Sequence, residues 1–348
     1  MTISPRKLRG SAFGVLAAAI VTLAGCASHS SSTAAATAAN GGSTPAGVTT
    51  VTVGITGATA PPTFLPLIAQ QFGLDTQNHI KIQFVTLTPD VTAQALSKGS
   101  VDILAAPSVE EATLQGASFK IIAGAALSYW HFVAGNGISS WASLSGKKIG
   151  LPCGVGATCV AFMDDVLKSH SVNPTSVTFI NGTAQGTYDA LAAGSVDAAL
   201  TTAPYTYALS SSGKTHEFDI TDQAPYLSTQ FSATSSYVDG NAAVVNDFVK
   251  AMSEAEADLQ QLPVSAKVLS VIDAYEKANG INPATLDQQK FLTEFAQDKS
   301  WQLVPTKALI TRDLQLIGQA DPTVSAAAKQ ATFSQLVYQV PEFAGRYA

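Results

Sequence analysis

The chain has 348 residues and a formal net charge of −6; 13% of its residues are charged and 46% are hydrophobic. This length and composition allow a sizeable buried core and favour two domains of roughly 100–200 residues each. The acidic balance argues against a nucleic-acid partner, because no basic surface is available to neutralise phosphates. After the N-terminal segment, Arg312 and Arg346 are the only arginines. We therefore do not expect a ligand site in which arginine makes bidentate contacts.

The first 26 residues have the features of an export signal. Arg6, Lys7 and Arg9 precede an apolar run of roughly 15 residues, which is too short for a membrane span. The run ends in the letters LAGC, which resemble the lipobox of bacterial lipoproteins, whose cysteine carries a diacylglycerol. The alternative is an ordinary secretory signal with a chance cysteine. We expect residues 1–26 to be a signal peptide with a lipobox and Cys26 to be the lipid anchor on the outer side of the cell membrane.

Residues 27–49 contain no aromatic and no charged residue, apart from a histidine that is neutral at pH 7. A segment rich in Ser, Thr, Ala and Gly cannot bury enough apolar surface to order itself. We therefore expect it to be a flexible tether.

The cysteine count agrees with an exported protein. With Cys26 assigned to lipid, Cys153 and Cys159 remain, and an even remainder in an exported chain suggests a disulfide. Free thiols are the alternative. Two cysteines without a nearby histidine pair make a poor zinc site, so we expect no metal.

From residue 49 onward, β-branched strands alternate with helical segments that end in glycine. The first half predicts strands at 49–57, 80–87, 101–107 and 119–127, with helices at 64–74, 91–99 and 108–116. The second half predicts strands at 147–152, 177–182 and 196–204, with helices at 157–170 and 183–194. From about residue 240 the chain is mostly helical, with apolar residues at helical spacing in 241–262, 284–297 and 308–319. This alternation predicts parallel sheets.

An octapeptide occurs twice, as ALSKGSVD at 95–102 and ALAAGSVD at 190–197. Each copy begins in the last turn of a predicted helix, passes through a glycine that ends the helix, and leads into a buried strand. The repeat therefore marks two similar halves. Ligands of open α/β sheets lie outside the carboxyl ends of the strands. If the two halves face each other, these ends enclose one cleft.

The order of lipobox, tether, octapeptide, LSGKKIG (144–150), second octapeptide and helical tail resembles the solute-binding proteins of bacterial ABC importers. The similarity is to the nitrate, sulfonate, taurine and thiamine-precursor group. It implies a type II periplasmic-binding fold with two α/β lobes, mixed but mainly parallel sheets and a helical C-terminal region. We expect residues 50–135 plus 230–348 to form lobe 1 and residues 136–229 to form lobe 2.

Several helix starts are expected at the cleft, where free backbone N–H groups favour an anionic group. Gly154 and Gly156 would let the backbone approach a ligand, although a plain tight turn is the alternative. Tyr129 and Trp130 would form an aromatic wall, or else pack in the core. The remaining expected ligand-binding residues are Thr59, Pro61, Thr63, Ser108, Thr158, Thr183, Thr202 and Tyr205.

Members of the resembled group that bind sulfonate or nitrate often use a basic side chain, and none stands at a predicted cleft loop. A small organic solute, with an anionic one among the candidates, is the expected cargo for import through ABC permease subunits. We expect a monomer without catalytic residues or cofactor. The alternatives are an enzyme on the same fold, such as a thiamine-pyrimidine synthase, or a sensor without a permease.

Overall fold

The computed structural model describes residues 47–88, 91–106, 109–153, 158–220, 222–282 and 286–348. The expected signal peptide, Cys26 and nearly all of the tether lie outside these residues, as do Ser108, Gly154 and Gly156. All described residues belong to one compact unit of the chain. Within this part of the chain, no helix combines the length and the apolar character needed to cross a membrane.

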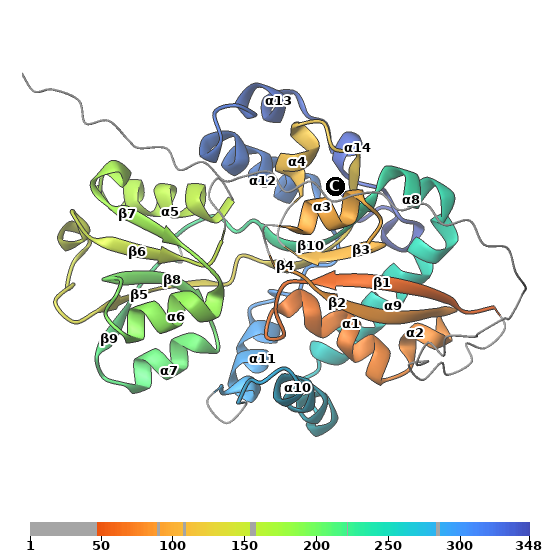
Figure 1. Ribbon diagram of the computed structural model, residues 1–348, viewed down its shortest axis with the longest axis horizontal. Coiled ribbons are helices and arrows are strands. Elements are labelled where there is room, and N and C mark those ends of the chain that lie inside the picture. Colours follow the sequence, from red (N-terminus) through yellow and green to blue (C-terminus); the bar gives the residue numbers. More distant parts are fainter. Residues whose placement is uncertain (1–46, 89–90, 107–108, 154–157, 221, 283–285) are drawn as a thin grey trace, which may run out of the picture. The chain divides into compact units, whose positions relative to one another are not determined.

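Two five-stranded sheets share one strand pattern (Figure 1). The first has the order β2-β1-β3-β10-β4, with β1 (Thr49–Ile55), β2 (Ile80–Thr86), β3 (Ile103–Ala106), β4 (Phe119–Leu127) and β10 (Leu227–Thr234). The second has the order β7-β6-β8-β5-β9, with β5 (Trp130–Gly135), β6 (Lys148–Leu151), β7 (Thr178–Asn181), β8 (Ala198–Thr202) and β9 (Thr215–Phe218). In each sheet only the fourth strand of this order runs antiparallel to its neighbours. The expected mixed, mainly parallel α/β architecture is confirmed.

We call each sheet with its helices a lobe. The helices of the first lobe are α1 (Pro61–Gln71), α2 (Leu74–Gln77), α3 (Thr92–Ser97), α4 (Glu110–Leu114), α8 (Ser235–Gly240), α9 (Ala242–Leu259), α10 (Ala266–Ala278), α11 (Gln288–Gln297), α12 (Lys307–Ala320), α13 (Ser325–Gln330) and α14 (Phe333–Leu336). Those of the second lobe are α5 (Thr158–Ser169), α6 (Ala184–Ala192) and α7 (Tyr205–Ser211). Short 3-10 helices cover Trp141–Leu144, Pro174–Ser176 and Pro341–Phe343.

Each sheet is covered on both faces, and the side chains of its strands alternate between two cores. In β3, Ile103 and Ala105 belong to the large core under α1 and α9, whereas Leu104 and Ala106 belong to a smaller one. In the second sheet, Phe132 packs toward α5 and its neighbour Val133 packs toward α6 and α7. Sheets buried on both faces explain why the strands read as nearly continuous apolar runs.

The duplicated octapeptide makes the same local structure in both lobes. Gly99 and Gly194 have φ values of 67° and 71°, the left-handed conformation that ends a helix most readily at glycine. The closing aspartates then reach the neighbouring strand, which is β1 in the first sheet and β6 in the second. Asp102 Oδ2 accepts from the backbone N–H of Thr52 at 2.8 Å, and Asp197 Oδ2 accepts from that of Lys148 at 2.8 Å. The repeat is therefore a connector that turns a helix into the third strand of each sheet.

The chain passes between the lobes twice, in a first crossing at residues 128–129 and a second between β9 and β10. Sheet membership therefore corrects the expected boundaries. The strand Trp130–Gly135 pairs with β8 and β9 of the second sheet, although we assigned it to lobe 1. Likewise β10 starts at Leu227, before residue 230, and β1 starts at Thr49, at the end of the expected tether. The strands next to each crossing join their sheets through long-range pairing, which local patterns do not report.

Candidate functional site

The carboxyl ends of the two sheets meet in the structure. Thr59 follows β1, Tyr205 follows β8, and their hydroxyl oxygens are hydrogen-bonded at 3.2 Å. These two predicted ligand-binding residues therefore join the lobes directly. Tyr205 is buried, with 4% of its surface exposed, and burial raises its pKa. Its hydroxyl remains protonated at neutral pH and can donate a hydrogen bond.

Pro61 and Thr63 stand at the start of α1, and both are buried. The Thr63 hydroxyl donates to the Gly57 carbonyl oxygen at 2.7 Å, so it shapes the loop that presents Thr59. Prolines at the first two helical positions fit here because no intrahelical donor is lost.

The predicted residues of the second lobe are spread over three elements. Thr158 is buried at the start of α5 beside the Tyr226 hydroxyl. The Thr183 hydroxyl caps α6 by accepting from the Gly186 N–H at 3.0 Å. Thr202 ends β8, where it pairs in register with Trp130. Ser108 lies outside the described residues, and the helix expected there is described from Glu110, without a side-chain cap.

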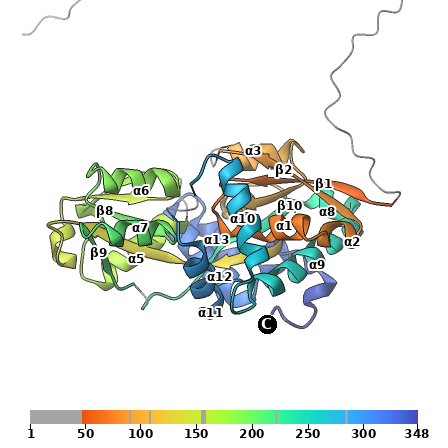
Figure 2. The ribbon, with the colours of Figure 1, turned by 90° about the horizontal axis from the view of Figure 1, so that it is seen from below.

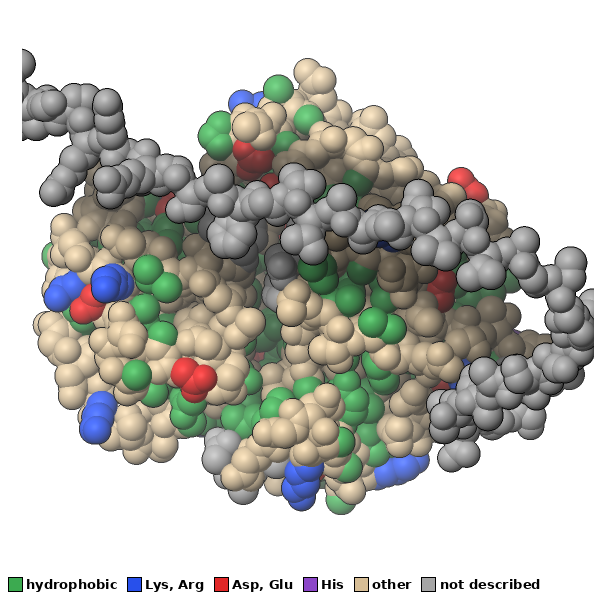
Figure 3. Space-filling model, viewed as in Figure 1, with side chains coloured by type: hydrophobic (Ala, Val, Ile, Leu, Met, Phe, Trp, Pro, Cys, Tyr) green, Lys and Arg blue, Asp and Glu red, His purple; other side chains and the backbone are tan. Residues whose placement is uncertain are grey.

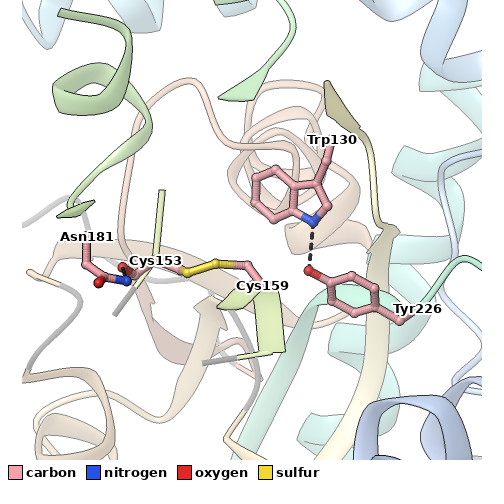
Figure 4. The surroundings of a disulfide bond; sticks show 5 residues. All are labelled: Trp130, Cys153, Cys159, Asn181 and Tyr226. Carbon is pink, nitrogen blue, oxygen red and sulfur yellow. Dashed lines mark hydrogen bonds between the residues drawn. A yellow bond between two sulfur atoms is a disulfide. The ribbon is translucent and has the colours of Figure 1, made fainter. Parts of the chain in front are cut away.

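Tyr129 and Trp130 form the aromatic connection between the crossings. Their rings stack with centroids 5.5 Å apart, and Tyr129 also contacts Phe295 of α11 at 5.3 Å. The Trp130 indole N–H donates to the Tyr226 hydroxyl at 2.7 Å, which ties the first crossing to the second (Figure 4). Burial raises the pKa of both Tyr129 and Tyr226. Tyr129 and Trp130 thus pack against neighbouring aromatic rings, and they also line the cavity described next. These are the two alternatives that the sequence left open.

A cavity of about 750 Å³ lies at the crossings. Its walls include the residues of the first crossing, residues 217–220, 223 and 225, the α7 residue Tyr207, and the side of α11 that carries Phe291, Glu294 and Phe295. This volume is in the range of small-molecule sites, roughly 300–1,000 Å³. On the face shown in Figure 3, the surface is hollowed where the lobes meet and apolar side chains gather along the junction.

Of the predicted ligand-binding residues, Tyr129 and Trp130 line this cavity. Sequence reasoning missed Tyr207, Glu217 and Glu294. Tyr207 hydrogen-bonds through its hydroxyl to the Glu294 carboxylate, so α7 of one lobe contacts α11 of the other. The only local signal was the position of Tyr207 two residues after Tyr205. Nothing in the helical pattern of 284–297 pointed to a binding surface.

Two further polar contacts involve charged side chains. Arg312 of α12 pairs with Asp165 of α5 at 3.2 Å, and the two helices pack side by side (Figures 1 and 2). His131 Nδ1 lies 2.5 Å from Glu217 Oε1 at the cavity wall. Arg312 is thus engaged in an ion pair between the lobes. Among the described residues, no group of three or more His, Cys, Asp or Glu side chains is arranged to hold a metal ion.

The Cys153 and Cys159 sulfur atoms are bonded to each other, between the end of β6 and the start of α5 (Figure 4). Their Cα atoms are 6.5 Å apart, and Cys159 is buried. The Asn181 side-chain amide, from the end of β7, donates to the Cys153 carbonyl oxygen at 3.0 Å. This arrangement fixes the carboxyl edge of the second sheet next to Trp130 and Tyr226.

Comparison with known proteins gives one family match. Residues 118–266 match the family model described as NMT1/THI5 like. Among curated proteins, none matches the sequence closely enough to count as a relative.

Solved structures match over most of the chain. The alkanesulfonate-binding protein SsuA from Xanthomonas axonopodis pv. citri, bound to MOPS, has a TM-score of 0.61 at 17% identity, covering 83% of this chain and 96% of that chain. The periplasmic aliphatic sulphonate binding protein SsuA from Escherichia coli has a TM-score of 0.62 at 16% identity, covering 86% and 95%. The periplasmic nitrate-binding protein NrtA from Synechocystis PCC 6803 has a TM-score of 0.63 at 13% identity, covering 82% and 86%.

The chain has the type II periplasmic-binding fold. The resemblance seen in the sequence is confirmed by this fold and by the NMT1/THI5-like match. That match spans both crossings and the whole second sheet, and it therefore includes most of the cavity wall.

Proposed function

We propose that this protein is an extracytoplasmic solute-binding protein that holds a small organic solute between its lobes and delivers it to an ABC permease. The contact between Thr59 and Tyr205 carries the proposal. It joins the carboxyl ends of two matched sheets, which is the position where open α/β sheets bind ligands. The cavity beside the crossings supplies the volume, and two crossings allow the lobes to open by hinge bending.

The similar solved structures named above are binding proteins, which supports a binding protein rather than an enzyme. In the cavity, Tyr129 and Trp130 would contact the solute, whereas Thr59 and Tyr205, which are not among the residues that line it, would hold the lobes together. Such a protein needs no catalytic residue, cofactor or partner copy, and we propose that it acts as a monomer.

Solute capture can be tested on the full chain purified without dialysis. Native mass spectrometry should detect a bound small molecule, and tryptophan emission should change when that molecule is added back to stripped protein. Small-angle scattering should then show a smaller radius of gyration with solute. If no molecule co-purifies, and sulfonates, nitrate, amines and pyrimidines all leave the emission unchanged, the proposal is wrong.

We further propose that residues 1–26 direct export, that Cys26 carries the lipid, and that the bond between Cys153 and Cys159 forms outside the cytoplasm. In cells, Cys26→Ala should move the protein from the membrane fraction to the soluble fraction. A thiol-reactive probe on unreduced, denatured protein should label neither Cys153 nor Cys159. Full labelling of both cysteines would contradict the disulfide but would leave the proposed lipid anchor at Cys26 unaffected.

A further inference from the structure

The cavity at the crossings has an uneven charge. Among the described residues that line it, four are carboxylates and none is lysine or arginine. Glu217 and Asp219 come from the end of the second sheet, and Glu294 and Asp298 come from α11, so both lobes contribute. Glu217 Oε1 lies 2.5 Å from His131 Nδ1. Asp298 follows the last turn of α11, whose carbonyl end adds further negative potential.

The rest of the wall is largely aromatic. Seven rings of Phe, Tyr or Trp line the cavity, among them Tyr129, Trp130 and Tyr207. The faces of such rings carry negative charge and attract cations, most strongly where water is excluded. Aromatic faces next to carboxylates favour an organic cation over an anion.

The chain itself shows this preference. The Lys290 ammonium lies 4.1 Å from the centroid of the Tyr207 ring and 3.9 Å from Glu294 Oε1. Tyr207 and Glu294 both line the cavity, whereas Lys290 does not. An alkylammonium thus already occupies the outer side of the ring and carboxylate pair. Lys290 therefore also offsets part of the negative charge of Glu294.

We propose that the cavity binds an organic cation, an amine or quaternary ammonium group carried on an aromatic or bulky apolar body. The inference rests on the proposed function, because it names the class of the solute. The carboxylates hold the cationic group, and Tyr129 and Trp130 stack against the apolar body. Since Glu217 and Glu294 belong to different lobes, the cation draws the lobes together when it binds.

Three probes with one body and different head groups test the class: 2-phenylethylamine, 2-phenylethanol and 2-phenylethanesulfonate. Titration calorimetry on the full chain should give the amine an affinity at least about tenfold above that of the alcohol, with the sulfonate weakest. The amine's advantage should shrink with added salt, because exposed carboxylates are screened. Tighter binding of the sulfonate would overturn the cationic class and leave solute binding itself intact.

Two variants separate recognition from folding. Glu294→Gln keeps a hydrogen-bond acceptor for Tyr207 but removes the charge, so amine affinity should fall about five- to tenfold while alcohol affinity is unchanged. Lys290→Met removes the internal ammonium and should tighten amine binding, an effect that a purely structural lysine would not produce. The exposed Glu342→Gln is the matched control and should change neither affinity.

Equal losses for amine and alcohol in Glu294→Gln would overturn the role of the charge. Binding of none of the three probes would overturn the inference for this cavity. In that case a co-purified molecule seen by native mass spectrometry would still uphold the proposed function, so the two failures can be told apart.

Discussion

The two lobes have the same strand order and the same octapeptide, yet they differ in what surrounds the sheet. In the first lobe, the segment around Trp301–Val304 runs along β4 and covers its edge, with Gly124 N–H donating to the Leu303 carbonyl oxygen at 2.8 Å. In the second lobe the edge strand β9 is mostly exposed. The repeat therefore leads into the amino end of the third strand of each sheet, away from the carboxyl ends that meet at Thr59 and Tyr205. The long C-terminal segment thickens one lobe and brings α11 to the cavity and α12 to α5.

The repeated aspartates show the same asymmetry. Asp102 accepts from both the backbone N–H and the hydroxyl of Thr52, at 2.8 and 2.6 Å. Asp197 accepts from the Lys148 N–H and makes only a loose ion pair with Lys147 at 3.7 Å. One motif thus ties the first sheet more tightly than the second. Four comparisons probe how the two lobes differ.

The largest effect is expected for Gly124→Ala. A Cβ at this position would lie 2.2 Å from the Gln302 carbonyl oxygen, so the covering segment would have to move. We expect a loss of about 3 kcal/mol in the free energy of unfolding. A strand glycine of the second lobe, Gly135→Ala, meets its nearest atom at 3.3 Å and should lose about 1 kcal/mol or less. Thermal unfolding followed by circular dichroism compares the two, and equal losses would refute the tighter covering of the first lobe.

The aspartates come next. Asp102→Ala leaves two donors of Thr52 without their acceptor and should cost about 2 kcal/mol. Asp197→Ala loses one backbone hydrogen bond and an exposed ion pair, which together are worth about 1 kcal/mol. Hydrogen exchange of the Thr52 and Lys148 amides should show the local loss in each variant. A larger cost for Asp197→Ala would reverse the proposed asymmetry.

Titration of two carboxyl groups in the first lobe should make the stability of the protein depend on pH. Burial raises the pKa of Glu256 and Glu276 to about 7, and both lie in the C-terminal segment that only this lobe has. A raised carboxyl pKa favours the folded state below the ordinary value of 4.5, and this contribution is lost as the pH rises through about 7.

Glu276→Gln should therefore match the parent protein near pH 4.5 and exceed its stability by about 1–2 kcal/mol at pH 8. The variant can keep the hydrogen bond with Gln288. Unfolding curves across this range decide the matter. A constant difference at all pH values would show that Glu276 does not titrate as proposed.

The smallest effects should be equal in the two lobes. Gly99→Ala and Gly194→Ala each force a side chain into a left-handed conformation, although neither Cβ would touch another atom. Each should cost about 1 kcal/mol. Gly240→Ala, which has open space and no positive φ, is the control and should be neutral or slightly stabilising. Unequal costs for the two repeat glycines would show that the octapeptides are not equivalent connectors.

Most of the fold could be predicted because its elements have local causes. The strand expected at 119–127 is β4, and the helix expected at 157–170 is α5 with its ends trimmed. The missed strands, β5, β9 and β10, lie on either side of the crossings. Their pairing depends on partners far away in the chain, such as Trp130 opposite Thr202. The α10 helix was also missed within a region expected only to be mostly helical.

The site was predicted less well, for a related reason. Thr59 and Tyr205 were expected from the strand ends, and the structure brings them together. Tyr129 and Trp130 were expected near the crossover, and they line the cavity. Glu217 and Glu294 were not expected, because each lies in a segment whose local pattern shows only a strand or an amphipathic helix. Their negative charge supports the organic cation proposed above, whereas the sequence predicted a small organic solute with an anionic one among the candidates.

The sequence by itself determined two matched α/β halves, since alternation, glycine stops and the repeated GSVD are properties of short segments. Only the tertiary structure decided which strands cross between the lobes and that α11 returns to wall the cavity. Those features depend on contacts between residues about 90 positions apart, such as Tyr207 with Glu294 at a separation of 87. The free energy of such contacts comes from packing and burial, which no local pattern encodes.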